Sequence, residues 1–61
     1  MKYSEQQLST IAKSMASGTH GSFAGHLGDA FIVADDTNKE IILESFSALF
    51  SKVARFLDIE E

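Results

Sequence analysis

Apolar residues in the last third of the chain cover more than one face of the helix that they predict. They recur at spacings of three and four residues, which is the helical period. A helix packed on one side needs an apolar stripe only about 100° wide. The excess predicts a second burial surface, which a short chain does not provide internally. The residues are Ile41, Ile42, Leu43, Phe46, Leu49, Phe50, Val53, Ala54, Phe56 and Leu57.

The length of the chain strengthens this argument. It has 61 residues, so we expect residues 1–61 to form a single small helical domain with a thin stability margin. Domains of this size usually need a disulfide, a metal or a partner. The absence of cysteine excludes disulfides and thiolate metal sites. The remaining stabiliser is a partner, and the simplest partner is a second copy of the chain.

Charge and hydropathy limit the other partners. The net charge is −4 and the basic residues are scattered, so long nucleic acid is not an expected ligand. The longest apolar run, residues 30–34, is far too short to span a membrane. The first residues are polar, so we expect no signal peptide. We therefore expect a cytoplasmic protein.

Capping signals and apolar spacing predict three short helices, and hence an all-α fold assembled into a homo-oligomeric bundle. The first helix spans residues 5–17, with a capping box between Ser4 and Gln7 and Gly18 as a left-handed C-cap. The second spans residues 22–34; its end has strand-forming residues, but no second strand is available to pair with it. The third begins near residue 38, with Thr37 as N-cap and Glu40 as its reciprocal partner. At residues 45–47 the third predicted helix either kinks, breaks or continues without interruption; the sequence leaves these alternatives open.

A glycine-rich stretch before the second helix has the composition of an anion cradle. Its backbone N–H groups, hydroxyls and imidazoles donate hydrogen bonds, and the helix dipole favours a phosphate. An aromatic ring there offers a face to a base. The structural alternative is that the glycines end a helix and form a turn, while Thr19 or Ser22 caps the next helix. The candidate ligand-binding residues are Gly18, Thr19, His20, Gly21, Ser22, Phe23 and His26.

Two further glycines, Gly25 and Gly28, lie inside the second predicted helix. Each costs roughly 1 kcal/mol relative to alanine. Glycine permits close approach of either another helix or a ligand. Of the two interpretations, close packing of another helix is the favoured one.

No residue set predicts catalysis, a metal site or a cofactor. Metal binding needs three or four converging ligands, and the chain has only two histidines. No nucleophile motif surrounds the serines. We therefore expect a protein that is not an enzyme, with no catalytic residues, no metal and no cofactor.

Several landmarks together resemble a family of very short phage and prophage proteins. The matching landmarks lie between residues 18 and 50, about two-thirds of the chain, and their order and spacing agree with the family pattern. Ser47 stands where that pattern has proline, so the resemblance leaves open whether the third helix breaks after Phe46. The landmarks are Gly18-Thr19-His20-Gly21-Ser22-Phe23, Leu27-Gly28-Asp29-Ala30-Phe31, Ala34-Asp35, Asn38, Phe46 and Leu49-Phe50.

The resemblance implies a function. Compact helical phage proteins of this kind are similar to the oligomeric sponges that sequester nucleotide immune signals, such as the cyclic dinucleotides of CBASS or the ADP-ribose signals of Thoeris. It implies a phage counter-defence protein that binds a small phosphate-bearing nucleotide without catalysis, in the host cytoplasm. Two alternatives stay open: an inhibitor that docks on a host protein, and a structural or regulatory oligomer without a ligand.

Overall fold

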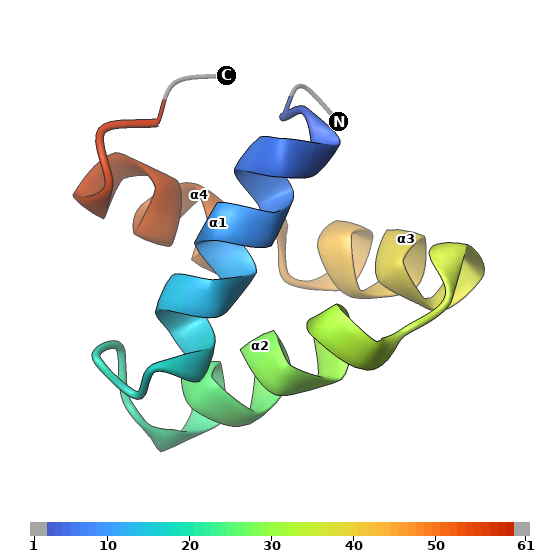
Figure 1. Ribbon diagram of the computed structural model, residues 1–61, viewed down its shortest axis with the longest axis horizontal. Coiled ribbons are helices and arrows are strands. Elements are labelled where there is room, and N and C mark those ends of the chain that lie inside the picture. Colours follow the sequence, from blue (N-terminus) through green and yellow to red (C-terminus); the bar gives the residue numbers. More distant parts are fainter. Residues whose placement is uncertain (1–2, 60–61) are drawn as a thin grey trace.

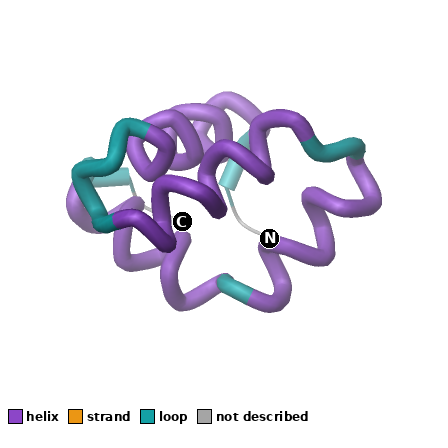
Figure 2. Tube along the Cα trace, turned by 90° about the horizontal axis from the view of Figure 1, so that it is seen from below, coloured by secondary structure: helices purple, strands orange, loops and turns teal. Residues whose placement is uncertain are grey.

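The computed structural model describes residues 3–59, and within that range it forms four α-helices and no strand. They are α1 (Glu5–Ala16), α2 (Ser22–Val33), α3 (Asp36–Ser45) and α4 (Ser47–Phe56). In Figure 1, α1 crosses in front of α4, with α2 below it and α3 to one side. Figure 2 shows that the connections between helices are short. The all-α prediction is confirmed, but the number of helices is four rather than three.

Helix α1 begins at the predicted cap. The Ser4 hydroxyl oxygen accepts the Gln7 backbone N–H at 3.1 Å, and the Ser4 N–H donates to the Gln7 side-chain oxygen at 2.9 Å. This capping box satisfies two backbone groups at the helix start. The helix ends at Ala16, one residue before the predicted end, and Gly18 follows with φ +86°. The left-handed residue that stops the helix is therefore the predicted one.

The junction between α2 and α3 differs from the sequence prediction. Thr37 is not the cap of the third helix: Asp35 caps it, and its carboxylate accepts the Asn38 N–H at 2.9 Å. Aspartate is as good an N-cap as threonine. Because the helix starts earlier, it gains one more backbone hydrogen bond, in which the Lys39 N–H donates to the Asp35 carbonyl oxygen at 2.8 Å.

The predicted third helix is split at Phe46, which separates α3 from α4. Phe46 has φ −122° and ψ 32°, outside the helical region. In Figure 1 the two halves lie on different sides of α1, with α3 to its right and α4 behind it and to its left. As a result Leu43 on α3 is buried, while α4 buries a different set of residues that includes Phe50 and Val53.

Because the helix is split, many of the surplus apolar residues are buried within the chain itself. The periodicity argument had predicted that a short chain could not bury them. The Phe31 and Phe50 rings meet at the centre, with centroids 5.2 Å apart. Ile41 and Phe56 stay on the outside, at 54% and 65% exposure. The buried core contains Tyr3, Ile11, Ala12, Met15, Ala24, Phe31, Leu43, Phe50, Val53 and Ala54.

Helix α2 packs against α1 through Gly28. A Cβ atom at that position would lie 2.6 Å from the Ala12 carbonyl oxygen and 2.7 Å from the Ala16 backbone nitrogen. At Gly25 the same atom would meet the Met15 carbonyl at an ordinary 3.5 Å. The predicted close helix packing is thus confirmed, and Gly28 is the residue that permits it.

No helix within residues 3–59 combines the length and the apolar character needed to cross a membrane.

Candidate functional site

The predicted glycine-rich residues form the turn between α1 and α2 and the start of α2. Gly18 and Gly21 both have positive φ, at +86° and +99°. The Gly21 N–H donates to the Gly18 carbonyl at 3.2 Å, which closes the turn. Positive φ is accessible to glycine without strain. The two glycines therefore set the sharp reversal that brings α2 back against α1.

The N-terminus of α2 has no side-chain cap. Gly21 occupies the N-cap position and makes no side-chain bond, so the interpretation that Thr19 or Ser22 caps this helix is wrong. Thr19 instead places its hydroxyl 2.9 Å from the Ser17 hydroxyl, and Ser22 is the first exposed helical residue. A Cβ atom on Gly21 would have no neighbour within 4 Å. The first-turn N–H groups of α2 thus have no side-chain cap within the described chain, and unsatisfied groups of this kind are what an anion cradle requires.

His20 is held in the fold rather than presented to solvent. It is half-buried, with its Nε2 atom 3.0 Å from the Ser14 hydroxyl. Its ring meets the Phe56 ring edge-on, with centroids 4.9 Å apart. Serine and histidine at this distance resemble a nucleophile and its base, but a triad also needs a group that orients the histidine. No hydrogen bond to the other ring nitrogen is made within the described chain. The contacts of His20 tie the turn to α4.

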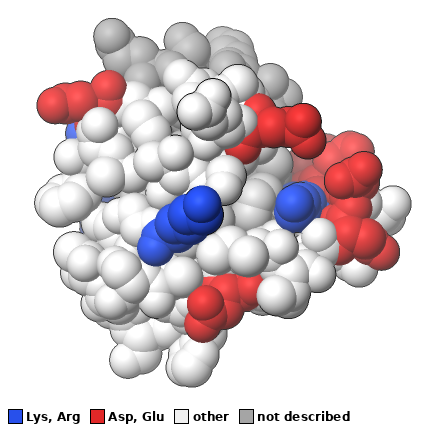
Figure 3. All heavy atoms as spheres, in the orientation of Figure 1, with Lys and Arg blue, Asp and Glu red and all other residues white. Residues whose placement is uncertain are grey.

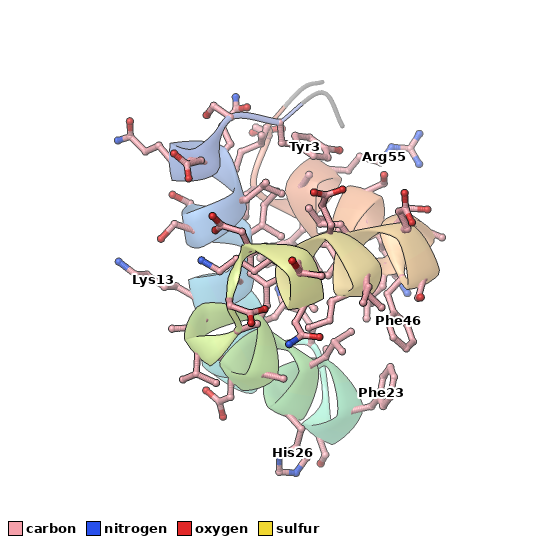
Figure 4. The ribbon with its side chains drawn as sticks, turned by 90° about the vertical axis from the view of Figure 1, so that its right-hand side faces the viewer. Tyr3, Lys13, Phe23, His26, Phe46 and Arg55 are labelled. Carbon is pink, nitrogen blue, oxygen red and sulfur yellow. The ribbon has the colours of Figure 1, made fainter. Side chains whose placement is uncertain are left out.

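Phe23 faces outward, with 63% of its surface exposed. Its ring lies 5.7 Å from the ring of Phe46 at an angle of 61°. Figure 4 shows Phe23 and Phe46 on the same edge of the molecule, whereas His26 points out of the lower end. His26 is exposed. The structure thus brings Phe23 to Phe46 but leaves His26 apart from this contact.

Two aromatic contacts, Phe23 with Phe46 and His20 with Phe56, join the start of α2 and the turn before it to the two ends of α4. We call these four residues the aromatic surface. The sequence placed Phe46 and Phe56 only in the core or an interface; it gave no sign that they meet the glycine-rich turn. Such contacts between distant segments depend on where the helix splits, which local spacing does not specify.

The sequence also missed a pocket between α1, α2 and α3. Its volume is about 390 Å³. Lys39 stands at its α3 side, with the amine 5.6 Å from the centroid of the Phe31 ring. One signal was available: Lys39 lies three residues before Ile42 and seven before Phe46, in register with the apolar face. The lining residues are Glu5, Gln6, Leu8, Ser9, Ala12, Phe31, Ile32 and Lys39.

Within residues 3–59 no group of three or more acidic or histidine side chains is placed to hold a metal ion. Comparison with protein-family models, with curated proteins and with solved structures found no match. The resemblance to short phage proteins therefore stays a prediction from the sequence landmarks.

Proposed function

We propose that the protein is a non-catalytic, homo-oligomeric binding protein that captures a small phosphate-bearing nucleotide between its copies. The observation that carries this proposal is the open N-terminus of α2 beside an exposed ring. Gly21 leaves the first-turn N–H groups without a side-chain acceptor, and Phe23 is 63% exposed two residues later. Backbone N–H groups at a helix start bind phosphate, and an aromatic face binds a base at about 1–3 kcal/mol per base.

Self-association supplies the second half of this site. Phe23 and Phe56 are each more than 60% exposed, and the aromatic surface contains no acidic residue. Contact through these four side chains removes no carboxylate of their own from water, which would be costly. A twofold contact uses the same surface on both copies. Contact through Phe23 therefore sets two α2 N-termini near each other, around one ligand.

The biological role that fits this capture is phage counter-defence in the host cytoplasm, by stoichiometric removal of a nucleotide immune signal. Its support is the resemblance of the glycine-rich turn and the downstream landmarks to short phage proteins. The ligand contacts we propose are the N–H groups of residues 21–23, the Ser22 hydroxyl and the Phe23 ring. Thr19 and His26 border the site, while His20 acts by holding the turn.

Ser22→Glu separates ligand binding from folding. A carboxylate in the first turn of α2 stabilises the helix by about 0.3–1 kcal/mol through the dipole, yet it repels a phosphate from the same N–H groups. Isothermal titration with a panel of cyclic dinucleotides and ADP-ribose derivatives should detect binding to the unchanged protein. Ser22→Glu should abolish that binding without lowering the melting temperature.

Thr37→Glu is the matched control, because Thr37 is an exposed residue in the first turn of α3. It adds the same charge at a different helix N-terminus and should leave nucleotide binding intact. Absence of binding across the whole panel would refute nucleotide capture. Equal loss of binding in both variants would show a general charge effect instead of a site at α2.

A second candidate function is inhibition of a host protein through the aromatic surface alone. The observation that favours it is the exposure of Phe23 and Phe56 on one small chain, since exposed aromatic side chains are enriched at protein interfaces. Under this function Phe56→Ser would abolish inhibition of the host protein, whereas Ser22→Glu would leave it unchanged. The opposite pattern would favour nucleotide capture.

A further inference from the structure

The pocket between α1, α2 and α3 contains none of the residues of the proposed nucleotide site. Its apolar walls are Leu8 from α1 and Ile32 from α2, and its floor is formed by the buried Ala12 and Phe31. Ile32, one of the lining residues, is 43% exposed, so it keeps apolar surface that a ligand can cover. A volume of about 390 Å³ falls in the range of about 300–1,000 Å³ that is usual for small-molecule sites.

The charges at the rim of this pocket are placed on opposite walls. Lys39 stands on α3 and Glu5 stands on α1. The Lys39 amine lies over the Phe31 ring, 5.6 Å from its centroid, and the residue as a whole is half-buried. Within residues 3–59 it has no carboxylate within salt-bridge distance. In Figure 3 the surface is hollowed to the right of centre, and side chains of both charges border the hollow.

We propose that this pocket binds a small aromatic carboxylate. The ring of the ligand lies between Leu8 and Ile32, where it removes open apolar surface from water. Its carboxylate pairs with the Lys39 amine, which no carboxylate of residues 3–59 approaches within salt-bridge distance, in a charge-assisted hydrogen bond. Glu5 repels an anion from the α1 wall, which fixes the orientation of the ligand. The hydroxyl of Ser9 and the amide of Gln6 offer further donors along that wall.

Indole-3-acetate and its neutral analogue indole-3-acetamide test this proposal directly. The two probes have the same ring and nearly the same shape, but only the first carries a charge. In an NMR titration of the full chain, the carboxylate should shift the backbone amide resonances of Leu8, Ala12 and Ile32. It should bind about tenfold more tightly than the amide, as expected for a hydrogen bond between charged groups.

Two neutral substitutions on opposite walls provide the matched variants. Lys39→Gln should remove the preference for the carboxylate over the amide. Glu5→Gln should keep that preference or increase it, because a repelling charge is lost. Equal affinity for both probes in the unchanged protein would overturn the proposal. So would resonance shifts confined to the aromatic surface, or the same Leu8 and Ile32 shifts on concentrating the protein alone, which would make a second copy the occupant.

Discussion

Replacing Gly28 by alanine tests the packing that holds the glycine-rich turn in place. The new Cβ atom would lie 2.6 Å from the Ala12 carbonyl oxygen, 2.7 Å from the Ala16 nitrogen and 2.8 Å from the Met15 Cβ atom. These atoms belong to the backbone of α1 or adjoin it, so the clash is relieved only if the two helices separate. Overpacking of this kind costs about 1–3 kcal/mol or more.

The helix propensity of alanine offsets part of this cost. Alanine is favoured over glycine by about 1 kcal/mol inside a helix. Because three neighbouring atoms would lie closer than 3.0 Å, the packing cost falls at the upper end of its range, about 3 kcal/mol, and we expect a net destabilisation of roughly 2 kcal/mol for Gly28→Ala. Gly25→Ala is the matched control, since its Cβ atom would meet atoms no closer than 3.5 Å. It receives the propensity gain without the clash and should stabilise the fold by about 0.5–1 kcal/mol.

Thermal unfolding followed by circular dichroism at 222 nm measures both variants. In a domain of this size each kcal/mol moves the melting temperature by about 4–8 °C, so the two variants should move in opposite directions. All samples must have the same protein concentration, because the self-association that we propose would make the melting temperature concentration-dependent. A Gly28→Ala protein as stable as the unchanged one would refute the close contact between α1 and α2.

Three capping predictions can be tested by urea unfolding. Ser4→Ala removes the capping box of α1 and should cost about 1 kcal/mol. Asp35→Ala should cost a similar amount, whereas Thr37→Ala should cost much less because Asp35 is the cap. A larger loss of stability in Thr37→Ala than in Asp35→Ala would show that Thr37 is the cap after all. Asp58 has φ +59° at the end of α4, and Asp58→Gly should stabilise the fold by about 0.5–1 kcal/mol; a loss of stability would contradict this geometry.

Local signals predicted much of the fold. The Ser4–Gln7 box and Gly18 set both ends of α1 to within one residue, because both are contacts between close neighbours in the sequence. Gly28 was correctly assigned to helix packing, since a costly glycine inside a helix needs a close neighbour. The assignment of Thr37 failed because Asp35 offers an equivalent acceptor two residues earlier, and local sequence does not rank the two.

The candidate site was less predictable because its contacts join distant segments. The turn glycines and the exposed Phe23 lie where the sequence placed them. The partner of His20 on α4, Phe56, depends on the path of the chain after Phe46. The sequence left the break there open, and without it the position of α4 could not be derived. The pocket at Lys39 could not be predicted either, because it forms only when three helices pack together.

The central claim is that copies of this chain associate through the aromatic surface. The most direct measurement is a dilution series of protein with 13C-labelled phenylalanine rings, followed by NMR from about 1 mM to 10 µM. The ring resonances of Phe23, Phe46 and Phe56 should change with concentration, while those of the buried Phe31 and Phe50 stay constant. Ring resonances that are independent of concentration over this whole range, in a protein whose native mass at 1 mM is that of a single 6.7 kDa copy, would contradict the claim.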